Sequence, residues 1–442
     1  MRRHLIWFRN DLRTTDHRAL SAIAASDDEV LPVMIIPPHV YGTTSFGLRR
    51  VGRFRARFLV ETLSELDANL ARIGARLLVT TGDPARVIAD LCARYTVTDL
   101  WAEDAAGTEE AADLKRVEVE ITRLGSPPRV HRTYATTLLH PDDLPFPADK
   151  VPFVFSDFRR AVERSWCVRP AAPPPTDGSI RAPAQWPPEP GWTDAARDGV
   201  PTVEELSGSR PTDDPRAVMR WRGGERAAAE RLGGWVWERD AIARYKETRN
   251  GLVGADYSSK LSPWLANGAL SARVVYEEIR RYEALRVRNE STYWMVFELL
   301  WRDYFVLVAR RFGGRLFARS GPRGVDRPWR ADADAFTRWC TGRTGNDFVD
   351  ANMREIAATG YMSNRGRQNV ASYLAHDLQL DWRMGAEYFE SELIDYDPAS
   401  NYGNWTYVAG VGTDPRQDRV FKPDLQAARY DADGAYRALW HE

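Results

Sequence analysis

The chain has 442 residues, a formal net charge of −1 and 43% apolar residues. This length exceeds what one ordinary hydrophobic core holds, so it predicts two or three domains. No run of about 18 apolar residues is present, which argues against a membrane span. The near-neutral charge provides no argument for a nucleic-acid partner at the level of the whole chain.

The N-terminus and the cysteines indicate a cytoplasmic protein. The opening "MRRHLIWFRNDLR" has an apolar stretch that ends at Phe8, too short for the core of a signal peptide, and we interpret it as a first β-strand. Cys92, Cys167 and Cys340 lie far apart and form no CxxC pair. A disulfide framework or a zinc site is therefore not expected, and a reducing compartment fits best.

The first 130 residues predict an α/β domain. Apolar runs at 5–8, 30–36, 75–81 and 98–103 are typical of buried strands. The spacing of apolar residues from Leu59 to Ile73 predicts an amphipathic helix, and residues 84–95 and 109–125 predict two more. Alternating strands and helices imply a mostly parallel, doubly wound sheet. No GxGxxG follows the first strand, so the usual dinucleotide fingerprint is absent.

A long connector and a helical domain are expected next. Residues 170–190 contain eight prolines, which is typical of an extended linker. Beyond residue 216 the pattern becomes helical, with predicted helices at 226–245, 273–287, 291–312, 348–360, 365–378 and 384–394. The predicted organisation is an α/β domain at 1–130, a connector at 131–215 and an all-α domain at 216–442.

The stretch "YSSKLSPWLANGALS" at 257–271 suits a phosphate group. Ser258, Ser259, Lys260 and Ser262 offer hydroxyl and ammonium donors where a loop enters a helix. The alternative is a plain helix start, with Ser262 as the N-cap and proline in the first turn. Taken by itself, the stretch favours this alternative.

Two further segments combine charges with aromatic or amide groups. In "FELLWRDYF", Glu298 and Trp301 share one helix face beside Arg302, which suits a planar heterocycle, although a surface ion pair over a core tryptophan is the competing interpretation. In "GYMSNRGRQ", Asn364 and Arg367 are neighbours near a helix start. Asp395 and Asp397, about thirty residues on, could pair with this arginine or help to position a ring with N–H and C=O edges.

Arginine and tryptophan are abundant, and both have ordinary explanations. Residues 301–330 contain eight arginines and two aspartates, so a solvated face and an anion-binding surface both remain open. The chain has 16 tryptophans, and bulky aromatics usually fill a core. Several of these tryptophans adjoin charged residues, as in "LLWRDYF", "LDWRMG" and "GNWTY", and simple packing does not explain that pattern well.

Together these segments resemble the photolyase/cryptochrome family, most closely its DASH-type cryptochromes. The resemblance rests on "WFRNDLR" at 7–13, on the segments at 257–271 and 297–305, and on a nearly unbroken block at 344–421. Within that block, "SNRGRQ", "DWRMGAE" and "SNYGNWTY" point to the DASH branch. The similarity spans most of the chain and is weakest in 140–240.

The resemblance implies FAD in the helical domain. Matching motif positions assign cofactor contacts to Tyr245, Ser258, Ser259, Lys260, Leu261, Ser262, Arg302, Asn364, Arg367, Asp395, Asp397 and Asn401. Asn401 falls where the family places the residue that faces flavin N5. A chain of electron-carrying tryptophans is implied at Trp405, Trp382 and Trp329, from the innermost to the surface.

The same resemblance implies light-driven repair of cyclobutane pyrimidine dimers by electron transfer from excited, reduced flavin to a flipped-out dimer. Substrate contacts map onto Glu298, Trp301, Gln368, Tyr407 and Arg249. Double-strand photolyases carry a Trp and a Met where this chain has Tyr407 and Gln368. The more polar pocket recovers less energy from a flipped dimer, so single-stranded or looped DNA is the expected substrate. The paired histidines of (6-4) photolyases are absent.

Other expectations complete this interpretation. A methenyltetrahydrofolate antenna is implied by the family, with Glu110 as a contact in the N-terminal domain. We expect a monomer without metal or membrane association, with RNA and duplex DNA as non-specific partners. The alternative function is a blue-light photoreceptor or regulator that binds FAD and nucleic acid without significant repair. A non-catalytic helical protein would require all these motifs to coincide by chance.

Overall fold

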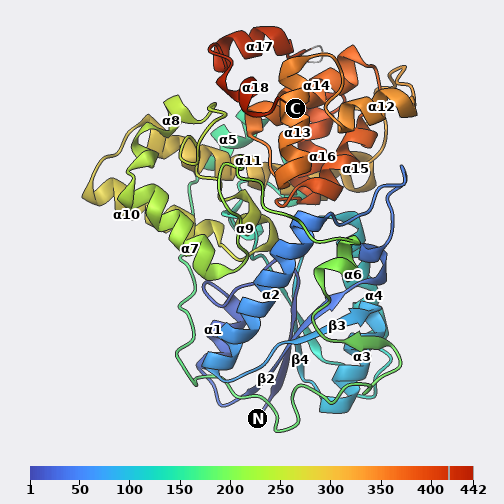
Figure 1. Ribbon diagram of the computed structural model, residues 1–442. Coiled ribbons are helices and arrows are strands. Elements are labelled where there is room, and N and C mark those ends of the chain that lie inside the picture. Colours follow the sequence, from blue (N-terminus) through green and yellow to red (C-terminus); the bar gives the residue numbers. More distant parts are fainter. Residues whose placement is uncertain (417–418, 442) are drawn as a thin grey trace.

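The computed structural model describes residues 1–416 and 419–441 and contains an α/β domain and a helical domain. In Figure 1 the two domains lie one above the other, with the sheet below and most helices above. The N-terminus lies at the far end of the α/β domain, and the C-terminus lies within the helical domain. The predicted fold class is confirmed.

The α/β domain is built on one six-stranded sheet in the order β5-β4-β1-β2-β3-β6. All neighbouring pairs are parallel except β3 and β6, and β1 pairs with β2 in the register Arg3↔Glu29 to Phe8↔Met34. The strands are β1 (Arg3–Phe8), β2 (Glu29–Ile36), β3 (Leu78–Gly82), β4 (Asp99–Glu103), β5 (Arg129–Thr133) and β6 (Ala196–Asp198).

Alternating side chains of β1 bury both faces of this sheet. Leu5 and Trp7 pack with the apolar faces of α3 (Pro84–Tyr95) and α4 (Thr108–Ile121). Ile6 and Phe8 point the other way and pack with α1 (Arg18–Ala24) and α2 (Arg53–Ile73). Because successive residues of a strand face opposite sides, a continuous apolar run is what two covered faces require.

Two strands were not predicted. The fifth strand, "RVHRT", has no residue that is fully buried, so it lacks the apolar run by which a strand is recognised. It also crosses the expected domain boundary at residue 130. The sixth strand belongs to the connector and adds antiparallel to the edge strand β3. The connector also contains α5 (Phe155–Arg164) and α6 (Val203–Ser207), and it buries Ile180 and Trp186 against the α/β domain.

The helical domain shares one large apolar core. Its helices are α7 (Glu225–Gly233), α8 (Tyr245–Thr248), α9 (Ser262–Asn267), α10 (Ala272–Leu285), α11 (Glu290–Phe312), α12 (Ala333–Cys340), α13 (Asp347–Thr359), α14 (Asn364–Ser372), α15 (Trp382–Glu392), α16 (Pro398–Val408), α17 (Pro423–Tyr430) and α18 (Ala435–Leu439). Two predicted helices are interrupted, because π-helical turns follow α7 at Gly234–Glu238 and α14 at Tyr373–Asp377.

Buried charges and one glycine lock the two domains together. Asp16 accepts a hydrogen bond from Arg273 Nε at 2.9 Å, and both side chains are buried. Arg13 donates to the carbonyl of Gly268 at 2.8 Å. Gly268 ends α9 at a φ of 77°, and a Cβ there would lie 1.8 Å from the Asn10 carbonyl oxygen, so only glycine fits this contact.

A candidate cofactor and substrate cavity in the helical domain

The main candidate site is a cavity of 630 Å³ formed by residues of the helical domain. Helices α11, α14 and α16, the segment 257–262 and the residues Arg416, Arg419 and Phe421 contribute to its wall. It gathers most of the predicted site residues: Tyr245, Arg249, Ser258, Ser259, Lys260, Leu261, Ser262, Glu298, Trp301, Arg302, Asn364, Arg367, Gln368, Asp395, Asp397 and Tyr407. A second cavity of 90 Å³ shares part of this wall and adds Asn401 and Trp405.

The segment 257–262 forms one end of the cavity. Arg231 holds its backbone, donating to the carbonyl oxygens of Ser258 and Ser259 at 2.9 and 2.8 Å. Lys260 adopts a left-handed φ of 54°, and its Nζ lies 3.1 Å from the centre of the Tyr257 ring. Ser262 does not cap α9; its hydroxyl donates instead to Asp395 Oδ2 at 2.6 Å. The plain helix-start interpretation is therefore wrong for this residue.

Arg367 and the two aspartates line the middle of the cavity. Arg367 Nη2 donates to Asp395 Oδ2 at 2.8 Å, and its Nε donates to the Met362 carbonyl. Burial acts to lower the pKa of Arg367, but the charge and hydrogen bond of Asp395 outweigh it and raise the pKa. Asp397 has a structural task, since its carboxylate accepts from the Ser400 N–H and caps α16.

Several buried polar atoms on these walls have no hydrogen-bond partner within residues 1–416 and 419–441. They are Tyr257 Oη, Lys260 Nζ, Gln368 Oε1, Asp395 Oδ1 and Trp405 Nε1. An unsatisfied buried polar atom costs about 1–3 kcal/mol. These unpaired atoms include both donors and acceptors, and they surround a large cavity. Such a lining fits a polar, partly aromatic ligand, so the residues present suit a flavin nucleotide.

Glu298 and Trp301 face the same cavity from α11. Glu298 Oε1 accepts hydrogen bonds from Arg249 Nη1 at 3.0 Å and from Trp294 Nε1 at 3.1 Å. Burial raises the pKa of Glu298, although Arg249 and Trp294 act to lower it. Glu298 therefore forms its ion pair with Arg249 in the cavity wall, whereas Arg302 of its own segment donates to the carbonyls of Thr136 and Leu265.

The rings around Trp301 determine what can stack on it. Phe155 of the connector covers one face, with ring centres 3.6 Å apart and planes inclined by 8°. Tyr407 stands perpendicular to Trp301 at 5.7 Å. Trp301 and Tyr407 both line the cavity, so together they form an aromatic corner in which at most one face of Trp301 is available to a planar group.

The three tryptophans of the expected electron chain differ from one another in whether they line a cavity and in how deeply they are buried. Trp405 lines the smaller cavity, whereas Trp382 and Trp329 line neither cavity. Trp382 is fully buried and donates to the Arg319 carbonyl, and Trp329, at 9% exposure, is the most exposed of the three. The ring of Trp405 contacts Phe389 and Trp339 instead of Trp382. Trp339 was not singled out from the sequence.

Basic side chains at the cavity are the predicted Arg249, Lys260, Arg302 and Arg367 and, in addition, Arg416 and Arg419, which were not predicted from the sequence. Within 301–330, the guanidinium groups of Arg302, Arg311, Arg315, Arg319, Arg323 and Arg330 donate to backbone carbonyl groups. Arg416 and Arg419 line the cavity, and Arg419 pairs with buried Asp414 at 3.2 Å. Their position inside the block at 344–421, about ten residues after the "SNYGNWTY" motif, was the signal that could have identified them.

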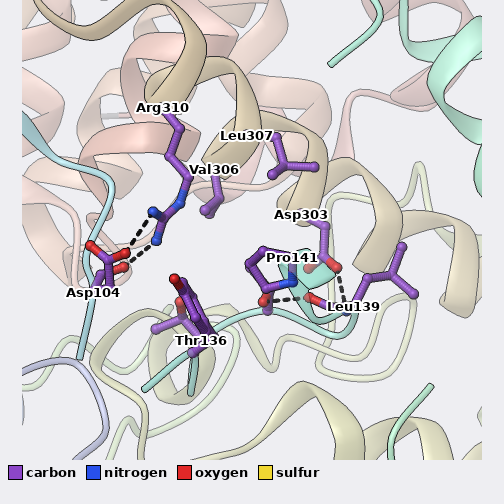
Figure 2. Close-up of a pocket in the computed structure, with 10 residues that line it drawn as sticks. Asp104, Thr136, Leu139, Pro141, Asp303, Val306, Leu307 and Arg310 are labelled. Atoms are coloured by element: carbon purple, nitrogen blue, oxygen red, sulfur yellow. Dashed lines mark hydrogen bonds and ion pairs between the residues drawn. The ribbon is translucent and has the colours of Figure 1, made fainter. Parts of the chain in front are cut away.

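Two other places do not join this site. Glu110 lines neither cavity; its carboxylate covers Gly107 near Pro398, and burial raises its pKa. A separate cavity of 10 Å³ lies where Arg310 of α11 pairs with Asp104 at 3.0 Å and Asp303 accepts from the Leu139 N–H (Figure 2). This space is large enough for only about one water molecule, which is too small for a ligand. It lies in the contact between the α/β domain and the helical domain.

Comparison with known proteins identifies the family. The chain matches the family described as DNA photolyase over residues 4–176 and the FAD binding domain of DNA photolyase over residues 294–441. It is 46% identical to cryptochrome DASH of Gloeobacter violaceus, covering 99% of this chain and 85% of that protein. It is 43% identical to the chloroplastic/mitochondrial cryptochrome DASH of Arabidopsis thaliana, covering 99% and 75%.

Solved structures agree with these matches. The crystal structure of a cryptochrome from Synechocystis sp. PCC6803 superposes with a TM-score of 0.92 at 40% identity, covering 100% of this chain and 88% of that one. A class III photolyase from Agrobacterium tumefaciens gives a TM-score of 0.82 at 28% identity, covering 100% and 86%. The chain therefore belongs to the photolyase/cryptochrome family, within its DASH cryptochromes, and contains the family's FAD-binding domain.

No described helix has the length and apolar character that a bilayer crossing requires. This finding covers residues 1–416 and 419–441.

Proposed function

We propose that this protein uses blue light and FAD to repair cyclobutane pyrimidine dimers, preferentially in single-stranded or looped DNA. The observation that supports this proposal is a single cavity. Its wall combines unsatisfied polar groups, which suit a flavin nucleotide, with an acid and an aromatic corner, which suit a base. When bound, reduced flavin excited by blue light would supply the electron that opens the cyclobutane ring.

The cofactor residues divide by chemistry. Ser258, Ser259 and Lys260 offer donors to the diphosphate, next to the backbone that Arg231 holds. The polar edge of the flavin would meet Asn364, Arg367 and Asp395, with Tyr245, Leu261, Ser262, Arg302 and Asp397 completing the wall. Asn401 donates from Nδ2 to the Ala386 carbonyl, so its amide oxygen is the atom available to an N–H group.

The lesion would occupy the mouth of the cavity. Glu298, kept in place by Arg249 and Trp294, would hydrogen-bond the dimer, and Trp301 would stack on one of its rings. Tyr407 and Gln368 add polar surface to this mouth. Because this pocket gains less binding free energy from the dimer, it cannot offset much of the free-energy cost of opening base pairs. Single-stranded or looped substrates are therefore preferred.

Electron supply and the antenna complete the proposal. Trp405 at the smaller cavity would be the donor nearest the flavin, followed by Trp382 and Trp329 toward the surface. Methenyltetrahydrofolate, the antenna expected for this family, would lie near Glu110. The structure of a Sulfolobus tokodaii photolyase with two FAD molecules shows that a second chromophore occurs in a relative.

The deciding experiment measures repair of a thymine-dimer oligonucleotide by the reduced protein under blue light, single-stranded and double-stranded side by side, with dark controls. Light-dependent repair restricted to the single strand is the expected result. Equal repair of both substrates would refute the argument from Tyr407 and Gln368. Absence of repair by protein that binds and photoreduces FAD would favour the photoreceptor.

A further inference from the structure

A phenylalanine of the connector lies directly behind the tryptophan that is proposed to stack on the lesion. Phe155 is the first residue of α5 and is buried, and its ring lies on that of Trp301 with 3.6 Å between the ring centres and 8° between the planes. This separation is van der Waals contact, so no other group fits between the two rings. Trp301 lines the larger cavity, whereas Phe155 lines neither cavity. Phe155 can therefore act on a ligand only through Trp301.

Other aromatic rings hold Phe155 in its own orientation. Phe297 and Tyr304, both on α11, form edge contacts with its ring at 5.2 and 5.5 Å, with interplanar angles of 84° and 74°. Such edge-to-face contacts are a favourable arrangement of aromatic rings. Phe158, which is fully buried and also belongs to α5, contacts the ring of Phe155 at 6.1 Å. Contacts from three rings fix the plane of Phe155, and a fixed plane can hold the Trp301 indole parallel to it.

Polar contacts fasten the start of α5 to the helix that carries the stacking tryptophan. Tyr304 Oη donates to the carbonyl of Phe153, two residues before Phe155. Arg159 Nη1, four residues after Phe155, donates to Tyr293 Oη at 3.0 Å. Both tyrosines belong to α11. Because these bonds lie on both sides of Phe155 in the chain, this part of the connector cannot shift along α11 without breaking one of them.

We propose that Phe155 is a positioning residue of the lesion site: by stacking on one face of Trp301, it holds the indole in the plane in which the other face receives one pyrimidine ring of the dimer. A tryptophan that is free to change its rotamer must be ordered when a base binds, and this ordering costs conformational entropy. An indole that is already held by Phe155 avoids most of that cost. The inference rests on the proposed function and gives the connector a role in substrate binding.

Phe155→Leu tests this role, because leucine keeps most of the apolar volume but has no flat face. Labelled single-stranded oligonucleotides, with and without a thymine dimer, are titrated with the full-length, FAD-bound protein and followed by fluorescence anisotropy. Phe155→Leu should weaken binding of the dimer by about 2- to 10-fold, the range that corresponds to the loss of one aromatic pair. Binding of the undamaged strand should not change, because it depends on phosphate contacts.

A double-mutant cycle separates a positioning role from a general effect on the fold. In the Trp301→Ala background the indole is absent, so Phe155→Leu should cause no further loss of dimer binding. If the two losses multiply instead, Phe155 acts independently of Trp301 and the proposal is refuted. Phe153→Leu is the matched control, because the ring of Phe153 packs against Phe312 and lines neither cavity. This control should bind both oligonucleotides as the unmodified protein does.

If Phe155→Leu does not fold, Phe155→Met carries the same test, since methionine fills irregular space without offering a planar face. Unchanged affinity of either folded, FAD-bound variant for the dimer, when the unmodified protein prefers the damaged strand, would overturn the inference and leave the proposed function intact. Equal binding of damaged and undamaged strands by the unmodified protein would refute the proposed function together with this inference.

Discussion

Replacing Trp301 by alanine tests the aromatic corner of the cavity. Because Phe155 covers one face of Trp301, the indole can stack on one base only. A single base–aromatic stack contributes about 1–3 kcal/mol. At about 1.4 kcal/mol per tenfold change, Trp301→Ala should weaken binding of a dimer-containing oligonucleotide by about 5- to 150-fold.

Fluorescence anisotropy with single-stranded oligonucleotides, damaged and undamaged, measures this loss, and flavin absorbance shows whether the cofactor site survives. The matched control is Trp192→Ala, because Trp192 bonds to Asp198 in the connector and lines neither cavity. Trp192→Ala should bind both oligonucleotides normally. Unchanged affinity of Trp301→Ala for damaged DNA, with FAD retained, would show that no base stacks on this ring.

Three further substitutions address the cation, the ion pair and the electron donor. Arg419→Ala should weaken binding of damaged and undamaged strands alike and reduce the slope of log K against log salt by about 0.7; an unchanged slope would exclude a phosphate contact. Asp395→Asn leaves Arg367 without its counter-charge and should lower the free energy of unfolding in urea by about 3 kcal/mol, with loss of flavin; unaltered stability would refute this role. Trp405→Phe should keep FAD but slow photoreduction severely, and normal photoreduction would eliminate the proposed chain.

Local patterns predicted the elements that are buried on both sides. The apolar run of β1 had to be a covered strand because Leu5 and Ile6 face opposite layers of helices. The polar strand β5 and the three-residue β6 carry no such pattern. They are strands because an edge of the sheet was available to their backbone groups, and that depends on the neighbouring strand.

In the candidate site too, local sequence patterns predicted some features and others depended on the tertiary structure. The hydroxyls near Lys260 were recognisable from the sequence, but their local pattern equally suited a helix cap, and only the position of Asp395 revealed the different partner of Ser262. The eight arginines at 301–330 suggested an anion surface, yet most of those described bind backbone carbonyls. Of these eight, Arg302 lines the cavity, together with Arg249, Arg367, Arg416 and Arg419 from elsewhere in the chain.

The sequence by itself determined the α/β domain, the helical domain, the family resemblance and the segments that carry polar and aromatic groups. These follow from periodicity and from motifs, which are local properties of the chain. Only the tertiary structure decided that Phe155 of the connector covers Trp301 and that Tyr436 of α18 hydrogen-bonds to Glu355 of α13. Contacts between residues this far apart depend on how the helices pack, because no local pattern encodes which buried surfaces meet.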